Sequence, residues 1–239
     1  RVTDAAVFVV TGQTSTQSVT ATGSATGSAM TVGSASLTAT GDTSGTSYKV
    51  TSANTSGVTV AAYRLKASND NVNLQRLVLK LTNTASSSSS DLTMVHIFDG
   101  NTEVGSATFT GGATFATSTL TTPVLLTRDT DKILTIKVDL GPVSNSSAVT
   151  VSGHLLNVDI DNNDSTGTYG TGVGSGVRVN STGSTSIGST GLRIFKSYPT
   201  LAQDTLTSSG LSAASPLLRF KVTADSKGPV NIAKFVVSL

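Results

Sequence analysis

The chain of 239 residues has no cysteine and no tryptophan, and aromatic residues make up only 5% of it. The lack of cysteine excludes disulfides, but a domain of this size has enough core to fold without them, so export stays compatible with the sequence. The lack of tryptophan leaves few rings on which a sugar can stack. No segment approaches the roughly 18 consecutive apolar residues of a membrane helix, so the sequence predicts no membrane span.

Charge is also scarce. Charged residues make up 13% of the chain, with a net charge of +2, whereas about a quarter is usual. Nucleic-acid binding needs clustered basic residues, and Arg64, Lys66, Arg76 and Lys80 are instead spread along predicted strands, so we expect no nucleic-acid partner. The missing charge is replaced by Ser, Thr, Gly and Asn. Weak repulsion between copies suits a protein that assembles.

An internal repeat dominates the chain. Residues 60–81 read VAAYRLKASNDNVNLQRLVLKL, and residues 217–239 read LLRFKVTADSKGPVNIAKFVVSL. Val72-Asn73-Leu74 matches Val230-Asn231-Ile232, an offset of 158 residues (230 minus 72), which is close to the size of one domain. The sequence therefore predicts a recurring module whose second copy begins near the end of the chain.

Within this repeat the apolar positions change parity. Val72 and Leu74 are even, whereas Leu77, Leu79 and Leu81 are odd. A strand alternates with a period of two, so the change predicts a β-bulge near Gln75 and Arg76. The polar residues 68–71 between the two strands predict a turn, and the pattern is typical of a hairpin.

The rest of the chain predicts short strands separated by turns. They cover residues 92–98, 103–109, 113–120, 132–140, 148–160, 177–180 and 192–198, with tight turns at Asp99-Gly100 and Gly111-Gly112 and a long polar loop at residues 161–176. No segment has the 3.6-residue period of a helix. Strands at this spacing predict an all-β fold, specifically an Ig-like antiparallel β-sandwich, with the start of a second copy at the C-terminus.

The N-terminal part is compositionally distinct. Residues 1–10 (RVTDAAVFVV) predict a strand, and residues 12–57 are rich in Thr, Ser, Ala and Gly, which is compatible with either a linker or polar β-strands. We therefore expect three parts: residues 1–57 as a strand plus linker or polar β segment, residues 58–198 as the sandwich, and residues 199–239 as the opening strands of a second module or a donor segment.

One cluster has the chemistry of a cation site. Asp159, Asp161, Asn163 and Asp164 form the densest group of oxygen ligands, and calcium prefers six to eight oxygens. The spacing departs from the EF-hand, because Asp164 stands where glycine belongs and Gly170 where a bidentate glutamate belongs. The cluster predicts either a structural Ca²⁺ site or an exposed turn rich in Asn and Asp.

No catalytic pattern is recognisable. His96 and His154 are the two histidines, and neither has a nucleophile-elbow sequence nearby, so we expect residues on strand faces and no enzyme. No cofactor motif is present, since no helix follows the glycine-rich segment near Tyr169. Asn54, Asn145, Asn163 and Asn180 fit the glycosylation sequon.

Four stretches resemble a module of large secreted surface proteins from ultra-small uncultivated bacteria. They are YRLKASNDNVNLQRLVLKL, LTMVHIFDGNTEVGSATF, ILTIKVDL and RFKVTADSKGPVNIAKFVVSL. The resemblance implies an Ig-like sandwich in an exported protein associated with a cell wall or surface layer.

We therefore expect an extracellular structural subunit of a layer or filament. Its partners would be further copies or neighbouring modules, joined through residues 1–10 or 216–239 adding to a sheet edge. The alternative is an adhesin that binds a surface glycan through the loops at residues 68–71 or 161–176.

Overall fold

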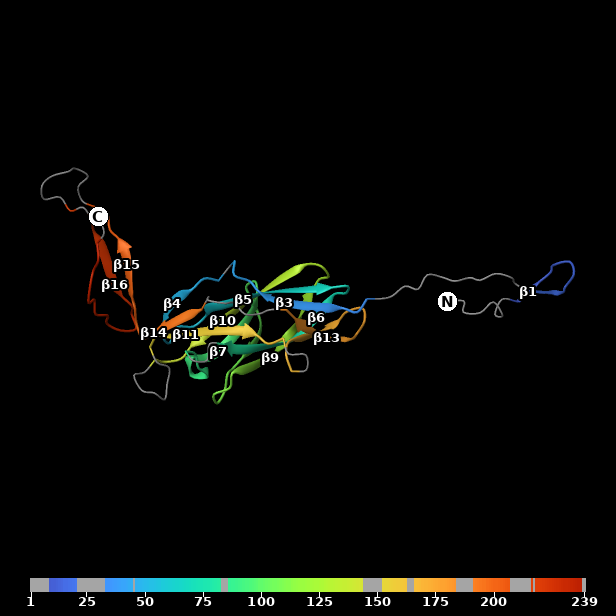
Figure 1. Cartoon of the computed structure of the whole chain (residues 1–239), viewed down its shortest axis with the longest axis horizontal. Coiled ribbons are helices and arrows are strands. Elements are labelled where there is room, and N and C mark those ends of the chain that lie inside the picture. Colours follow the sequence, from blue (N-terminus) through green and yellow to red (C-terminus); the bar gives the residue numbers. More distant parts are fainter. Residues whose placement is uncertain are drawn as a thin grey trace. The chain divides into compact units, whose positions relative to one another are not determined.

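The computed structural model describes residues 9–20, 33–44, 46–82, 86–143, 152–162, 166–183, 191–206, 216 and 218–237. The chain divides into two compact units, Arg1–Gly33 and Ser34–Leu239. The described residues form strands, turns and a single 3-10 turn at Ser89–Asp91, which confirms the all-β prediction (Figure 1). No helix in this part of the chain has the length and apolarity needed to cross a membrane.

The first unit contains a small two-stranded sheet. β1 (Val9–Thr11) pairs antiparallel with β2 (Ser18–Thr20), and the amide of Gly12 donates to the carbonyl of Gln17 at 2.9 Å to close the turn. Within the described residues this sheet has no third strand.

The second unit contains a mixed sheet of twelve strands. In chain order they are β3 (Ser36–Gly41), β4 (Lys49–Ser52), β5 (Val58–Ser68), β6 (Val72–Thr82), β7 (Leu92–Asp99), β8 (Thr102–Ala107), β9 (Phe115–Leu126), β10 (Asp131–Leu140), β11 (His154–Ile160), β12 (Tyr169–Gly172), β13 (Arg178–Thr182) and β14 (Leu192–Phe195). Hydrogen bonds connect them in the order β4-β14-β11-β6-β12-β13-β3-β5-β10-β7-β8, and β9 also pairs with β6. In Figure 1, β4 and β14 lie at one end of this sheet and β13 at the other.

The prediction of a purely antiparallel sheet is wrong for two pairs. β13 runs parallel to β3, and β14 runs parallel to β4. Both pairs join an early strand to one more than a hundred residues later, so no tight turn sets their direction. A sequence pattern that records only alternation along each strand cannot reveal such pairings.

The strands face each other across one apolar core. Leu65 of β5 and Leu134 of β10 contribute from one side, and Leu77 of β6 and Leu156 of β11 contribute from the other; all four are fully buried in a single cluster. The hydroxyl of Tyr63 on β5 crosses the core and donates to the carbonyl of Val158 on β11 at 2.6 Å. The inward-facing positions predicted for residues 134–140 are confirmed by their burial.

The strands at residues 58–82 do not form the expected hairpin. β5 pairs with β3 and β10, whereas β6 pairs with β9, β11 and β12, and no ladder joins β5 to β6 within the described residues. The predicted turn is present, with Asn69 at φ 69°, but it carries the chain from one side of the core to the other. This arch forms because both strands have a fully apolar face, and the two faces bury each other.

The predicted bulge is confirmed. β6 pairs with β9 as Leu74 opposite Val124 and Arg76 opposite Thr119, with a register shift between Leu74 and Arg76. The extra residues of that shift lie on β9, whereas opposite β12, where Leu74 pairs with Gly170 and Arg76 with Tyr169, Gln75 is the extra residue on β6. The extra residue lets Leu74 and Leu77 enter the same core despite their opposite parity.

Two further expectations are resolved. Residues 36–52 contain strands, as in the polar-strand alternative for residues 12–57, and Leu37 and Ala39 of β3 are buried. The long loop expected at residues 161–176 is wrong in part, because it contains β12. A Cβ on Gly170 would lie 2.5 Å from Cγ1 of Val72 and 2.6 Å from the carbonyl oxygen of Asn73, so β12 approaches β6 through glycine rather than through an apolar pattern.

The C-terminal part forms a separate two-stranded sheet. β15 (Pro199–Gln203) pairs antiparallel with β16 (Phe220–Ala224). Residues 225–237, which continue the repeat, are not in a strand.

Candidate functional site

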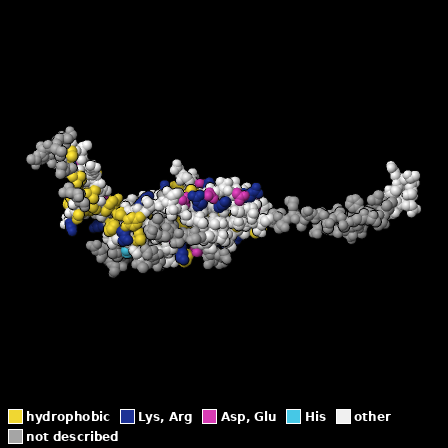
Figure 2. All heavy atoms as spheres, turned by 45° about the horizontal axis from the view of Figure 1, so that its top comes forward, with side chains coloured by type: hydrophobic (Ala, Val, Ile, Leu, Met, Phe, Trp, Pro, Cys, Tyr) yellow, Lys and Arg dark blue, Asp and Glu magenta, His cyan; other side chains and the backbone are white. Residues whose placement is uncertain are grey.

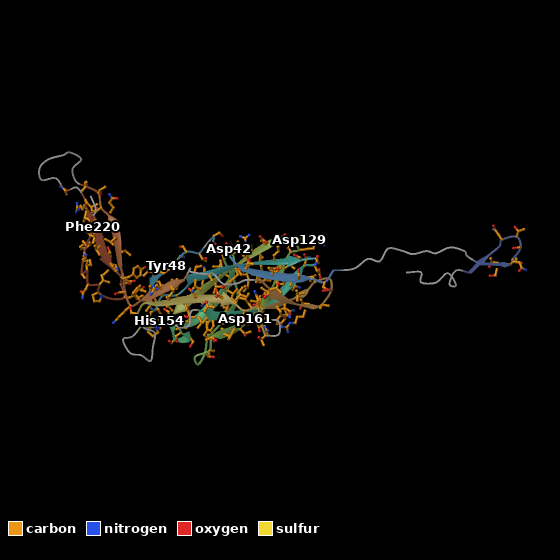
Figure 3. All side chains as sticks on the ribbon, viewed as in Figure 1. Asp42, Tyr48, Asp129, His154, Asp161 and Phe220 are labelled. Carbon is orange, nitrogen blue, oxygen red and sulfur yellow. The ribbon has the colours of Figure 1, made fainter. Side chains whose placement is uncertain are left out.

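The predicted calcium ligands are only partly described. Asp159 is buried on β11, where its Oδ1 lies 3.3 Å from the Tyr63 hydroxyl. Asp161 follows β11 and its carbonyl accepts from the amide of Thr168 at 2.9 Å (Figure 3). Asn163 and Asp164 lie outside the described residues. No cluster of three or more His, Cys, Asp or Glu side chains suited to a metal occurs in the described ranges, and the calcium site stays a prediction.

The inward orientation of Asp159 has its own physical role. Burial, reinforced by the nearby carboxylate of Asp159 and its hydrogen bond, raises the pKa of Tyr63 well above its ordinary value. The tyrosine therefore stays protonated and donates to both Val158 and Asp159. This contact fixes β5 against β11, and it occupies one oxygen of the acidic cluster.

The segment that precedes β12 is held by a basic side chain. Arg76, beside the bulge, donates through Nε and Nη2 to the carbonyl of Gly167 at 3.1 and 2.8 Å, and through Nη2 to that of Thr166. The guanidinium groups of Arg76 and Arg178 lie 4.7 and 4.0 Å from the centre of the Tyr169 ring. Tyr169 is the aromatic side chain best placed by sequence for sugar stacking, and these contacts already use its ring.

The turn of the β5–β6 arch is similarly engaged. Asp70 Oδ2 accepts from the amides of Gly174 and Ser175 at 2.9 and 3.1 Å. Asn71 Oδ1 accepts from the amide of Arg128 at 2.8 Å, and Asn69 Nδ2 donates to the carbonyl of Ser34 at 3.0 Å. The polar groups of this loop, which the adhesin alternative requires for a ligand, hold neighbouring segments in place.

The two histidines lie on strands, as expected, and both contact carboxylates. His96 on β7 places Nδ1 2.8 Å from Glu103 on β8 and Nε2 3.3 Å from Asp139 on β10. The hydrogen bond with Glu103, followed by that with Asp139, raises the pKa of His96, while partial burial opposes this. His154, at the start of β11, places Nδ1 3.0 Å from Asp91, which is completely buried. The contacts of His96 connect neighbouring strands, and that of His154 connects β11 to the 3-10 turn before β7.

A different surface stands out at the C-terminus, because β15 and β16 repeat β3 and β5 in the same register. Leu201 pairs with Val222 as Ala39 pairs with Leu65, and Gln203 pairs with Phe220 as Gly41 pairs with Tyr63. The sequence repeat aligns Phe220 with Tyr63. The structure therefore extends the repeat back to a strand that the sequence comparison did not reveal.

The aspartate that follows each first strand repeats its backbone hydrogen bond as well. The amide of Asp42 donates to the carbonyl of Ala62 at 2.8 Å, and that of Asp204 donates to the carbonyl of Arg219 at 2.9 Å. Each carboxylate also lies near an arginine, but the two arginines are not equivalent: Asp42 lies 3.5 Å from Arg64, which aligns with Lys221, and Asp204 lies 3.1 Å from Arg219, which aligns with Ala62. Apart from the shared aspartate and one threonine, the aligned segments differ, so sequence reasoning had little signal with which to find β15.

The same positions differ sharply in exposure. Tyr63, Leu74, Leu77 and Leu79 are 0% exposed, whereas their counterparts Phe220, Ile232, Phe235 and Val237 are 39%, 45%, 54% and 62% exposed. The centres of the Phe220 and Phe235 rings lie 5.1 Å apart, so β16 is in contact with the segment that follows it, residues 225–237. Figure 2 shows hydrophobic side chains gathered over this C-terminal part, and Figure 3 labels Phe220. We call residues 199–206 and 218–237 the open module.

Comparisons of the chain with models of protein families, with curated proteins and with solved structures find no match.

Proposed function

We propose that the chain is a modular structural protein of an extracellular assembly, a surface layer or filament built from Ig-like β-sandwich modules. The observation that carries the proposal is the open module, which repeats the register of the first module and the backbone hydrogen bond of its aspartate but leaves its core positions exposed. Contiguous apolar surface of this kind marks an interaction site rather than a solvated face. The low charge of the chain supports association of copies.

The adhesin alternative receives less support. Polar groups in the loops at residues 68–71 and 166–176 form hydrogen bonds with other parts of the same chain. The Tyr169 ring lies against the guanidinium groups of Arg76 and Arg178. A glycan site needs polar groups and a ring face directed at the ligand. Assembly is therefore the function that we favour.

Electron microscopy and sedimentation of the purified full chain test the proposal. We expect filaments or sheets, and we expect Phe235→Ser to abolish them because it removes a large exposed ring from the open module. Phe115→Ser is the matched control, since Phe115 is 47% exposed on β9 and lies outside the open module. A full chain that stays monomeric at every concentration would contradict the proposal.

The same experiment with a calcium chelator tests the acidic cluster. Loss of assembly on chelation, restored by added Ca²⁺, would support a metal site that includes Asp159 or Asp161. Assembly that is unaffected by the chelator would leave Asp159 as the buried partner of Tyr63 and Asp161 as a residue of the segment after β11.

A further inference from the structure

The turn that follows β16, residues 225–229, contacts the end of the main sheet. Lys227 Nζ donates to the carbonyl of Asn54 at 2.9 Å, and the Ser197 hydroxyl donates to the carbonyl of Pro229 at 3.1 Å. Asn54 follows β4, and Ser197 follows β14. Because β4 and β14 are parallel, the residues that follow them lie at the same end of the sheet, and the turn of the open module meets that end.

A third contact connects the same turn to β4 itself. The carboxylate of Asp225 accepts hydrogen bonds from the amide of Lys227, at 2.8 Å, and from the side chain of Ser52. These two bonds lower the pKa of Asp225, although desolvation opposes them. The first bond shapes the turn, and the second joins it to the main sheet.

The main sheet holds the receiving groups in place. The amide of Ala53 donates to the carbonyl of Phe195 at 2.8 Å, and the amide of Asn54 donates to the carbonyl of Gly141 at 3.2 Å. Asn54 has a φ of 54°, a left-handed conformation that asparagine tolerates better than most residues. The backbone after β4 is thus fixed by its own sheet, so the carbonyl that Lys227 meets is already positioned.

The repeat changes its chemistry at this turn. In the main sheet, Asp70 of the equivalent turn accepts from the amides of Gly174 and Ser175. Lys227 stands at the position of Asp70, and a lysine side chain has donors but no acceptor, so it cannot repeat that contact. The second copy is also longer here, with residues 225–229 in place of residues 68–71. The two copies therefore diverge at the residues that contact the main sheet.

The connection between the two parts is short. β14 ends at Phe195 and β15 begins at Pro199, which leaves 3 residues between them (199 minus 195 minus 1). Ser197, which bonds to the turn, is the middle one. Each of these exposed hydrogen bonds is weak alone, but so short a connection keeps the two surfaces close together, and the bonds form within one chain. Together they favour one orientation of the open module on the main sheet.

We propose that the end of the main sheet at Ser52, Asn54 and Ser197 is a docking surface for the turn of the module that follows it in the chain. The partner is defined by its chemistry, a turn that presents an ammonium group, a carboxylate and a backbone carbonyl. The inference rests on the proposed function and specifies how neighbouring modules are joined. Docked modules repeat at a regular spacing, as a filament or layer requires, whereas relative motion is the rule for domains without such a contact.

Distances between spin labels in the full chain test the docking. The chain has no cysteine, so labels attach only to introduced ones. One pair is Lys49→Cys on β4 with Thr223→Cys on β16, both exposed positions. The reference pair is Lys49→Cys with Ser106→Cys on β8, inside the main sheet. An excess of unlabelled chain removes distances between neighbouring copies, and double electron–electron resonance gives the distribution of distances for each pair.

We expect the pair that spans the junction to give a single distance, with a distribution as narrow as that of the reference pair. The double variant Ser197→Ala/Lys227→Met should broaden this distribution several-fold and leave the reference pair unchanged. Lys221→Met is the matched control, because Lys221 is an exposed lysine on β16 outside the turn, and we expect it to leave both distributions unchanged. A broad distribution in the unmodified junction pair would overturn the inference, and so would a narrow one that persists in the double variant.

This inference and the proposed function fail in different ways. A chain that assembles but gives a broad junction distribution keeps the structural function and loses the docking surface. A chain that stays monomeric at every concentration but gives a narrow distribution, broadened by Ser197→Ala/Lys227→Met, keeps the docking surface and loses the proposed function.

Discussion

At the scale of single residues, Tyr63 shows how the core is held together. Its ring is completely buried, and its hydroxyl connects β5 to the backbone and side chain of β11 on the other side of the core. The repeat places Phe220 at the same position in the open module, where no described counterpart of β11 exists.

Tyr63→Phe is expected to destabilise the fold by about 1–3 kcal/mol, because it leaves the Val158 carbonyl and the Asp159 carboxylate without this buried donor. Urea unfolding followed by far-ultraviolet circular dichroism measures the change. Tyr48→Phe is the control, since Tyr48 is half exposed, and we expect it to change stability by less than about 0.5 kcal/mol. Equal effects of the two variants would contradict this role for Tyr63.

The His96 contacts give the stability of the β7–β8 edge a pH dependence. The pKa of His96 is raised in the folded chain, so its contribution is fully present below the pKa of an unfolded histidine, about 6.5. That contribution is lost as the pH rises through the higher folded value. Exposed ion pairs contribute little, so the effect is small.

We therefore expect the unfolding midpoint to fall slightly between about pH 6 and pH 8, and His96→Gln to remove this slope. Because partial burial is outweighed by the hydrogen bonds from the Gly57 amide and from His96, the pKa of Asp139 is lowered. Stability from Asp139 is lost only in acid, which separates the two effects. A slope that persists in His96→Gln would assign the dependence to another group.

At the scale of elements, β6 carries the most demanding geometry. It pairs with three strands, and its two halves point apolar residues of opposite parity into one core through the single extra residue at Gln75. The side chain of Gln75 is only half-buried. We therefore expect the stability of β6 to depend more on the presence of a residue at this backbone position than on its side chain.

Deleting Gln75 gives Val72, Leu74 and the leucines that follow one parity, so a regular strand keeps its apolar face in the core. We expect a loss of about 1–3 kcal/mol, because the register of β6 with β12, which skips Gln75, must shift. Replacing the same residue by alanine keeps the bulge, and we expect a loss of under about 1 kcal/mol. Proton NMR dispersion and thermal unfolding distinguish the two variants. A deletion variant as stable as the unmodified chain would show that the bulge contributes nothing to the stability of β6.

Much of the local geometry of the strands and turns was predictable from the sequence. The bulge, the turn at Asn69 and the alternation of β10 follow from local parity and turn chemistry, and all three are confirmed. β12 was missed because its close approach depends on Gly170, which carries no apolar signal. The arch was mistaken for a hairpin, since two apolar strands and a polar turn give the same pattern in both cases.

The candidate site was only partly predictable. The repeat at residues 217–239 is visible as a spacing of apolar residues, but the equivalence of β15 with β3 depends on backbone register. The exposure of Phe235 and Ile232 is likewise a property of missing neighbours, which no pattern within the segment can reveal.

At the scale of the whole molecule, the contrast is between a closed module and an open one. The main sheet buries its apolar residues in one cluster, while the open module keeps equivalent residues in contact with water. Local stability follows buried contacts and protected backbone hydrogen bonds, so the two regions must differ in how often they open.

Hydrogen exchange followed by mass spectrometry tests this contrast. In dilute solution we expect amides at residues 220–224 and 230–237 to exchange orders of magnitude faster than those at residues 63–67 and 72–79. In the assembled state we expect the amides of residues 220–224 to exchange slowly as well. Equal protection of both modules in dilute monomer would contradict the description of the second as open.

The parallel pairing of β3 with β13 also constrains the order in which the chain can fold. Leu37 lies opposite Ser181, 144 residues later (181 minus 37), so the first strand of the module waits for one of the last before the sheet is complete. Closing so long a loop is entropically costly, and sheets dominated by distant pairings fold slowly, in about milliseconds to seconds. On a ribosome the first module cannot close until β14, which pairs with β4 and ends at Phe195, has emerged, and β15 begins only 4 residues after that (199 minus 195). Synthesis of the second module therefore starts almost as soon as the first can finish. This order keeps two sets of strands with the same pairing pattern from competing for one core.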